Sequence, residues 1–98
     1  MPTFIATLKF TPQGLANIQD TCKRAASFKA VAQKAGARVI ENYWTLGPFD
    51  GVLLFEAPDE DTATALMLRL TALGNVHTQT ARALTTGEME KVLGKKVG

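Results

Sequence analysis

The chain has 98 residues, a length that fits one domain over residues 1–98 and leaves no room for a second. Apolar residues make up 46% and charged residues 20% of the chain, so we expect a folded protein that is neither disordered nor inserted in a membrane. The net charge of +2 is too weak to favour nucleic acid as a partner.

Cys22 is the only cysteine, which excludes an internal disulfide and a four-ligand Cys/His zinc site built from one chain. The first ten residues carry no basic segment ahead of their apolar residues, so we expect no signal peptide. These features together predict a cytoplasmic protein without a metal site.

In residues 3–10, Phe4, Ala6, Leu8 and Phe10 alternate with the mixed set Ile5, Thr7 and Lys9. This period of two is typical of a strand that packs one face on a core. Residues 11–14 break this strand, and a short irregular turn is expected before a helix that begins at Asp20 or Thr21. Gly36 is expected to end that helix. Its apolar stripe, which includes the cysteine as a small buried hydrophobe, contains Cys22, Ala25, Phe28, Val31, Ala32 and Ala35.

Residues 38–46 and 49–56 are predicted to form a hairpin around Gly47 and Pro48. If Leu46 lies opposite Phe49, the pairing assigns each side chain of the hairpin to one face of the sheet. A four-residue loop would leave this assignment unchanged. A three-residue loop would exchange the two faces of one strand. The face under the helices, with the tryptophan in the core, then contains Ile40, Asn42, Trp44, Leu46, Phe49, Leu53 and Phe55. The other face contains Val39, Glu41, Tyr43, Thr45, Asp50, Val52, Leu54 and Glu56.

Acidic residues at 59–61 favour the start of a second helix, which runs to a stop at Gly74 and Asn75. Residues 76–84 then alternate as an edge strand. Thr85 and Glu88 match a capping box that opens a short terminal helix.

The order β-α-β-β-α-β predicts a ferredoxin-like α+β fold, in which an antiparallel four-stranded sheet carries both helices on one face. The strand at 52–55 has apolar side chains at both its odd and its even positions, so it is apolar on both faces of the sheet. The face without helices must therefore also be shielded from water. We expect a homodimer of the dimeric α+β barrel type, or a higher homo-oligomer, that buries Ile5, Thr7, Val39, Tyr43, Val52 and Leu54.

Several segments resemble the GYD-domain family of small proteins, namely residues 43–50 (Tyr-Trp-Thr-Leu-Gly-Pro-Phe-Asp), 56–59, 73–76 and 78–80. Gln13, Gly14 and Arg24 also fall where the pattern of that family has them. The tyrosine of the Gly-Tyr-Asp triplet is replaced here by Phe49, so a role for its hydroxyl is lost while a packing role for the ring survives. The resemblance implies the ferredoxin-like fold and the dimeric architecture, and it implies little chemistry.

Candidate ligand-binding residues are Tyr43, Asp50 and Glu56, on one face of the hairpin, together with Gln13 and Arg24. A structural interpretation competes with this one: the aspartate then caps the reversal, and the glutamate pairs with an arginine. Arg24, Arg38 and Arg82 are suited either to anchor an anion or to bridge surface carboxylates.

Asp50 and His77 are weak candidates for catalysis, because a desolvated carboxylate or a histidine can transfer protons near neutral pH. A single histidine on an edge strand is more often solvated, and no cofactor motif is present. Three functions remain open: a small protein that binds an organic ligand between sheet faces, a cofactor-independent isomerase or oxygenase acting on a small acid or aromatic, and a component of a larger assembly.

Overall fold

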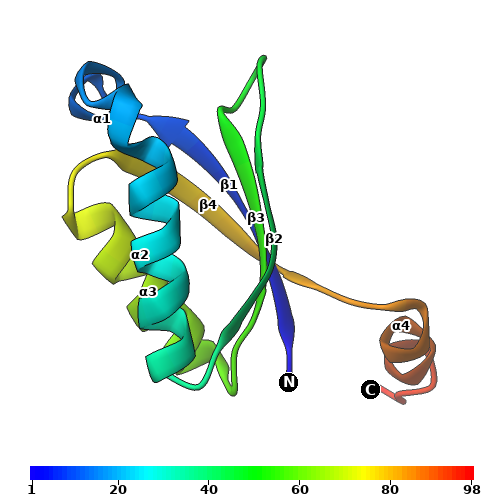
Figure 1. Cartoon of the computed structure of the whole chain (residues 1–98). Helices are drawn as coiled ribbons and strands as arrows, with labels where there is room; N and C mark the ends of the chain where they lie inside the picture. Colours follow the sequence, from blue (N-terminus) through cyan, green and yellow to red (C-terminus); the bar gives the residue numbers. More distant parts are fainter.

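A four-stranded antiparallel sheet carries two long helices on one of its faces in the computed structural model, which describes all 98 residues (Figure 1). The strands are β1 (Thr3–Phe10), β2 (Arg38–Trp44), β3 (Gly51–Glu56) and β4 (Val76–Ala83), in the spatial order β2-β3-β1-β4. The covering helices are α2 (Thr21–Lys34) and α3 (Glu60–Ala72). This confirms the ferredoxin-like α+β fold and the edge position of the last strand.

Three smaller elements complete the chain. A short helix α1 (Pro12–Ala16) and a 3-10 turn η1 (Ile18–Asp20) occupy the segment expected to be irregular. The terminal helix α4 (Thr86–Leu93) begins with the predicted capping box, in which Thr85 and Glu88 hydrogen-bond each other's backbone N–H. No helix of the chain is both long and apolar enough to cross a lipid bilayer.

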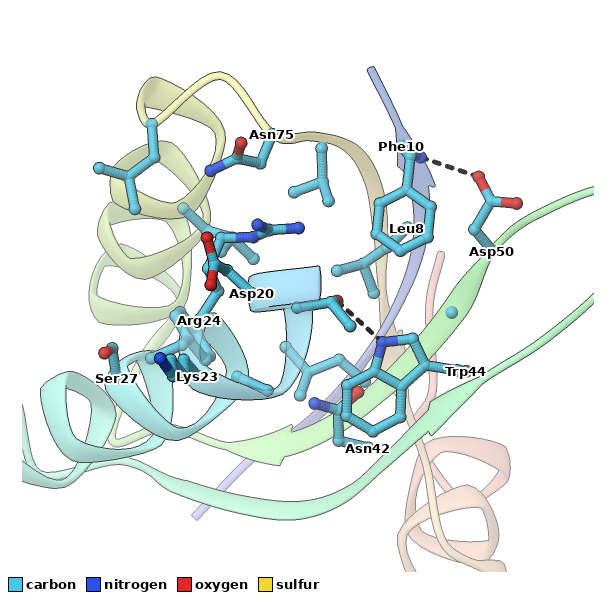
Figure 2. Close-up of a pocket in the computed structure, with 18 of the residues that line it drawn as sticks. Leu8, Phe10, Asp20, Lys23, Arg24, Ser27, Asn42, Trp44, Asp50 and Asn75 are labelled. Atoms are coloured by element: carbon cyan, nitrogen blue, oxygen red, sulfur yellow. Dashed lines mark hydrogen bonds between the residues drawn. The ribbon is translucent and has the colours of Figure 1, made fainter. Parts of the chain in front are cut away.

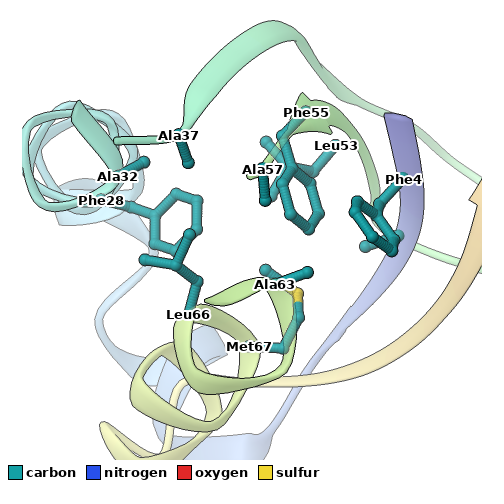
Figure 3. Packing of buried hydrophobic residues seen from close by; sticks show 11 residues of the cluster. Phe4, Phe28, Ala32, Ala37, Leu53, Phe55, Ala57, Ala63, Leu66 and Met67 are labelled. Carbon is teal, nitrogen blue, oxygen red and sulfur yellow. The ribbon is translucent and has the colours of Figure 1, made fainter. Parts of the chain in front are cut away.

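The hydrophobic core lies between the sheet and the two long helices (Figure 3). The rings of Phe4 on β1 and Phe55 on β3 stack with their centroids 5.5 Å apart, and Phe55 is fully buried. Removing these side chains from water supplies most of the stability of a domain this small. The other members of the core are Ala6, Phe28, Ala32, Ala37, Leu53, Ala57, Ala63, Leu66 and Met67.

The hairpin pairs as predicted over residues 41–44 but not before them. Tyr43 lies opposite Val52 and Asn42 opposite Leu53, the register that follows from placing Leu46 opposite Phe49. A β-bulge between Val39 and Glu41 then shifts the pairing by one residue. Because the bulge inserts one residue into β2, Val39 lies opposite Phe55 and packs against the core, so its predicted place on the uncovered face was wrong.

Four side chains expected in apolar surroundings are instead exposed, and Ala35, which follows the last residue of α2, is the smallest of them. Leu46 is fully exposed because β2 ends at Trp44, two residues before its predicted end, and β3 begins at Gly51, two residues after its predicted start, so the turn projects beyond the sheet. Trp44 lies on the helix-covered face, beside the first residue of α2, but keeps 46% of its surface exposed. Cys22 is exposed as well, because the first turn of α2 lies at the margin of the sheet.

No helix of the chain covers the sheet face turned away from α2 and α3 (Figure 1). Ile5 on β1 lies opposite Leu54 on β3, and Tyr43 lies opposite Val52, so these four side chains form an apolar centre on that face. Ile5 is 39% exposed and Tyr43 57% exposed. This group of four residues is called the open-face patch below.

Helix α4 stands apart from the rest of the molecule, beyond the end of β4 (Figure 1). The largest dimension of the protein is consequently 50 Å, against 21 Å for the smallest. The apolar side chains on and just before this helix have no internal partner layer, and Leu84, Met89, Val92 and Leu93 are all exposed.

The cap of α4 makes this helix sensitive to acid. Hydrogen bonding from the Thr85 N–H, 3.0 Å from Oε1, lowers the pKa of Glu88, and the nearby Arg82 guanidinium lowers it further. A carboxylate with a lowered pKa stabilises the folded form at neutral pH, and this contribution is lost as the pH falls through the folded pKa. We expect Glu88→Gln to remove this dependence on pH.

The measurement is amide hydrogen exchange and carbon chemical shifts of residues 86–93, followed from neutral pH down to about pH 3. Glu90→Gln is the matched control, because the Glu90 side chain lies on the same helix and makes no capping hydrogen bond. If α4 of the Glu88→Gln variant frays in acid as the unmodified helix does, the capping carboxylate is not the cause.

Candidate functional site

A cavity of about 620 Å³ opens between α2, the end of α3 and the sheet, on the helix-covered side (Figure 2). Its volume lies in the range of pockets that take small organic molecules. Its apolar wall includes Leu8, Phe10, Phe28, Val31, Leu53 and Leu70.

Polar side chains line the other walls of this cavity. Asp20, Lys23 and Arg24 come from η1 and α2, Asn42 comes from β2, and Arg69 comes from α3. Trp44 closes one side, and its indole Nε1 donates a hydrogen bond to Thr21 Oγ1 at 3.0 Å (Figure 2). This bond joins the end of β2 to the start of α2 across the mouth of the cavity.

Arg24 is the cavity residue with the least satisfied side chain. Its Nη1 donates to the carbonyl oxygen of Asn17 at 2.7 Å, which fixes the guanidinium against the turn before α2. Its Nη2 is buried and has no hydrogen-bond partner. No carboxylate forms an ion pair with it, since the two ion pairs of the chain are Arg38–Glu56 and Arg82–Glu88.

Asp50 fastens the hairpin to β1. Its Oδ2 accepts a hydrogen bond from the Phe10 N–H at 2.8 Å, and its own N–H donates to the Leu8 carbonyl at 2.7 Å (Figure 2). Its carbonyl oxygen also accepts from the Thr45 N–H, 2.9 Å away. The carboxylate therefore has a structural role at the hairpin base, which is close to the capping role considered from the sequence.

Gln13 and Gly14 form a close contact between α1 and the turn before β4. The Gln13 side chain donates to the Leu73 carbonyl at 2.9 Å and to Asn75 Oδ1 at 3.1 Å. A Cβ atom on Gly14 would lie 2.1 Å from the Asn75 carbonyl oxygen, so only glycine permits this approach. The contact positions Leu73 and Asn75, both of which line the cavity.

The structure brings two of the five predicted ligand-binding residues, Arg24 and Asp50, to the cavity. Tyr43 lies in the strand at the cavity edge, but its side chain is on the open face of the sheet, opposite Val52. Gln13 lies behind the cavity wall in the contact with Asn75. Glu56 lies on the opposite side of the sheet, where it accepts a hydrogen bond from Arg38 Nε at 3.0 Å and pairs with the same guanidinium.

The two weak candidates for catalysis are not joined to each other. His77 is exposed on β4, opposite Lys9, and no hydrogen bond links it to Asp50. No group of three or more His, Cys, Asp or Glu side chains is arranged to hold a metal ion. Asp50 and His77 therefore do not form an acid–base pair with each other.

Seven polar residues of the cavity wall were not among the candidates from the sequence: Asp20, Thr21, Lys23, Ser27, Asn42, Arg69 and Asn75. Arg69 carried a detectable signal, since it is the only basic residue in the apolar α3. The others carried none, because polar side chains at a helix start or a strand end are common on any surface.

The family model named GYD domain matches residues 4–93. The chain belongs to the GYD-domain family. It is 32% identical over 90 residues to a protein of Thermus thermophilus named glutamine synthetase and cystathionine beta-lyase binding protein, and the match covers 91% of this chain and 95% of the relative. The segments that suggested the family include Gln13, Gly14 and residues 73–76, which the structure joins in the contact described above.

Proposed function

We propose that this member of the GYD-domain family is a homodimeric binding protein that docks on metabolic enzymes. The observation that carries the proposal is α4, an amphipathic helix that projects from the domain with its apolar side chains exposed. The relative from Thermus thermophilus, named for binding glutamine synthetase and cystathionine β-lyase, supports a protein as the partner. A cytoplasmic location follows only from the sequence and stays a prediction.

The homodimer is proposed to form through the open-face patch, with the two sheets stacked face to face. Such stacking buries the aliphatic centre of the patch in a self-complementary contact. Lys9, Glu41 and the Arg38–Glu56 ion pair lie on the same face around that centre, as in the polar rim of many protein interfaces.

Helix α4 is proposed to contact the client enzyme. Met89, Val92 and Leu93 are spaced to share one side of the helix, and helices of this kind lie in apolar grooves of their partners. Lys91, Lys95 and Lys96 lie beside and after these residues and add positive charge, which favours an acidic margin around such a groove.

The test is titration calorimetry of the purified protein against glutamine synthetase and cystathionine β-lyase from its own organism. We expect binding to at least one of the two, and we expect Val92→Asp to weaken it by about a hundredfold, because the substitution places a charge in an apolar contact. Ala26→Asp, on the exposed side of α2, is the control and should bind as the unmodified protein does.

Failure of both enzymes to bind would refute the proposed clients. If Val92→Asp instead produces monomers in sedimentation, α4 belongs to the contact between subunits and not to the client contact.

A second candidate function is binding of a small organic molecule, which is favoured by the cavity beside Trp44. This cavity lies on the helix-covered side of the sheet, whereas the sequence led us to expect a ligand between stacked sheets. The ligand-binding site proposed here is therefore the cavity under the helices. The enzymatic alternative has no comparable observation, because Asp50 is already hydrogen-bonded to the backbone of β1.

A further inference from the structure

The arginines considered for anion binding differ in their partners. Arg38 pairs with Glu56 at 2.9 Å, and Arg82 pairs with Glu88 at 3.2 Å. Arg24 has only the neutral Asn17 carbonyl as an acceptor. The structure therefore separates two arginines that bridge carboxylates from one that is left without a carboxylate.

A guanidinium nitrogen that is buried without a hydrogen-bond partner lowers the stability of the folded protein. An unpaired buried donor loses its hydrogen bonds to water and gains nothing in return, and the loss is larger for a charged group. The Arg24 Nη2 is such a donor, and the side chain lies on the cavity wall. An acceptor that reaches this guanidinium from the cavity would supply the missing partner.

The charges around the cavity also favour an anion. Lys23 and Arg69 line it together with Arg24, and the only carboxylates on the wall are Asp20 and Asp50. Asp50 already accepts a hydrogen bond from the Phe10 N–H, and Asp20 forms no ion pair with any of the three cations. The wall is thus net positive by one charge.

We propose that this cavity binds a small organic carboxylate with an apolar or aromatic body, anchored by Arg24. The carboxylate accepts hydrogen bonds from the guanidinium, a planar donor that matches carboxylate geometry. The body of the ligand packs against the apolar wall formed by Phe10, Phe28 and Leu70. This inference rests on the small-molecule function proposed for the cavity, and it is independent of the docking of enzymes through α4.

Trp44 provides the readout, because it is the only tryptophan of the chain and lines the cavity. Its indole Nε1 is held by Thr21, so a ligand that enters changes the surroundings of a fixed fluorophore. The probe is 4-phenylbutyrate, which combines one carboxylate with a flexible aromatic body. The neutral comparison is 4-phenylbutyramide, which has the same shape without the charge.

Titration of the full-length protein with 4-phenylbutyrate should change the Trp44 emission in a saturable way at millimolar concentrations or below. Arg24→Gln should weaken the acid by about ten- to a hundredfold and leave the amide unchanged. Arg38→Gln removes the same charge on the opposite face of the sheet and should bind as the unmodified protein does. Asp20→Asn should strengthen binding of the acid, since it removes a negative charge from the cavity wall.

Equal affinity for the acid and the amide would overturn the role of Arg24 while leaving a ligand-binding cavity. No saturable response to either probe would overturn both the cavity function and this inference. Thermal unfolding of each variant checks that the fold is intact, and if Arg24→Gln does not fold, the response of Asp20→Asn decides in its place.

Discussion

Replacement of Gly14 by alanine should lower the free energy of unfolding by about 3 kcal/mol, the largest effect expected from a single methyl group in this chain. The added Cβ would lie 2.1 Å from the Asn75 carbonyl oxygen and 3.0 Å from its carbonyl carbon. Both atoms belong to the backbone, so no side-chain rotation relieves the clash. Either α1 or the turn before β4 must move, and the Thr11 N–H bond to the Asn75 carbonyl is stretched or lost.

Gly87→Ala is the matched control for this substitution. A Cβ on Gly87 has no atom within 4 Å, and the residue lies in the first turn of α4 with no positive φ angle. Alanine there should leave the free energy of unfolding unchanged or raise it by about 0.5 kcal/mol, because alanine favours a helix over glycine. Denaturant unfolding of the two variants measures the difference, and equal stabilities would mean that the α1 contact yields at little cost.

The Gly14 substitution should also reach the cavity. Leu73 and Asn75 are held in place by the Gln13 side chain and line the cavity wall. A displaced turn should therefore weaken binding of 4-phenylbutyrate even where the variant remains folded. Binding that stays unchanged would show that this turn has no part in shaping the site.

Leu54→Lys should convert the proposed homodimer into monomers. Leu54 lies at the centre of the open-face patch, directly opposite Ile5. In a stacked dimer, the two-fold symmetry would bring two new ammonium groups into one apolar contact, at a cost of several kcal/mol. Sedimentation velocity at micromolar concentration should show the unmodified protein as a dimer and the variant as a monomer.

Leu68→Lys makes the same chemical change on the outer side of α3, where the leucine is 64% exposed. This variant should remain a dimer, since α3 covers the other face of the sheet. A monomeric unmodified protein would refute the stacked dimer outright. A Leu54→Lys variant that stays dimeric would place the contact elsewhere, with α4 as the next surface to test.

Two features could be predicted from the sequence: the order of the elements, and a sheet with helices on one face and an uncovered second face. Strand alternation at residues 3–10 and the capping box at Thr85 and Glu88 are local patterns, and each appears in the structure where it was expected. The β-bulge beside Ile40 could not be predicted, because no residue in that strand signals an inserted position. As a result, Val39 lies on the helix-covered face and not on the uncovered face where it was predicted.

For the candidate site as well, the sequence indicated some residues, but the contacts between them are known only from the structure. Arg24 and Asp50 were identified as residue types suited to binding or catalysis, but the hydrogen-bond partners of each depend on how η1 and the hairpin pack. The ion pair between Arg38 and Glu56 joins residues from two strands, and neither Arg24 nor Arg69 has such a carboxylate partner. Such contacts cross long stretches of chain and leave no periodic signal.

The sequence by itself determined the order of the long helices and strands, the ferredoxin-like topology and the family, because these depend on local periodicity and on short motifs. Only the tertiary structure decided that the cavity lies under the helices, that α4 projects away from the domain, and that the buried Nη2 of Arg24 has no hydrogen-bond partner. The physical reason is that hydrogen-bond satisfaction and cavity shape are set by contacts between residues distant in sequence, and each such contact depends on the packing of all the others.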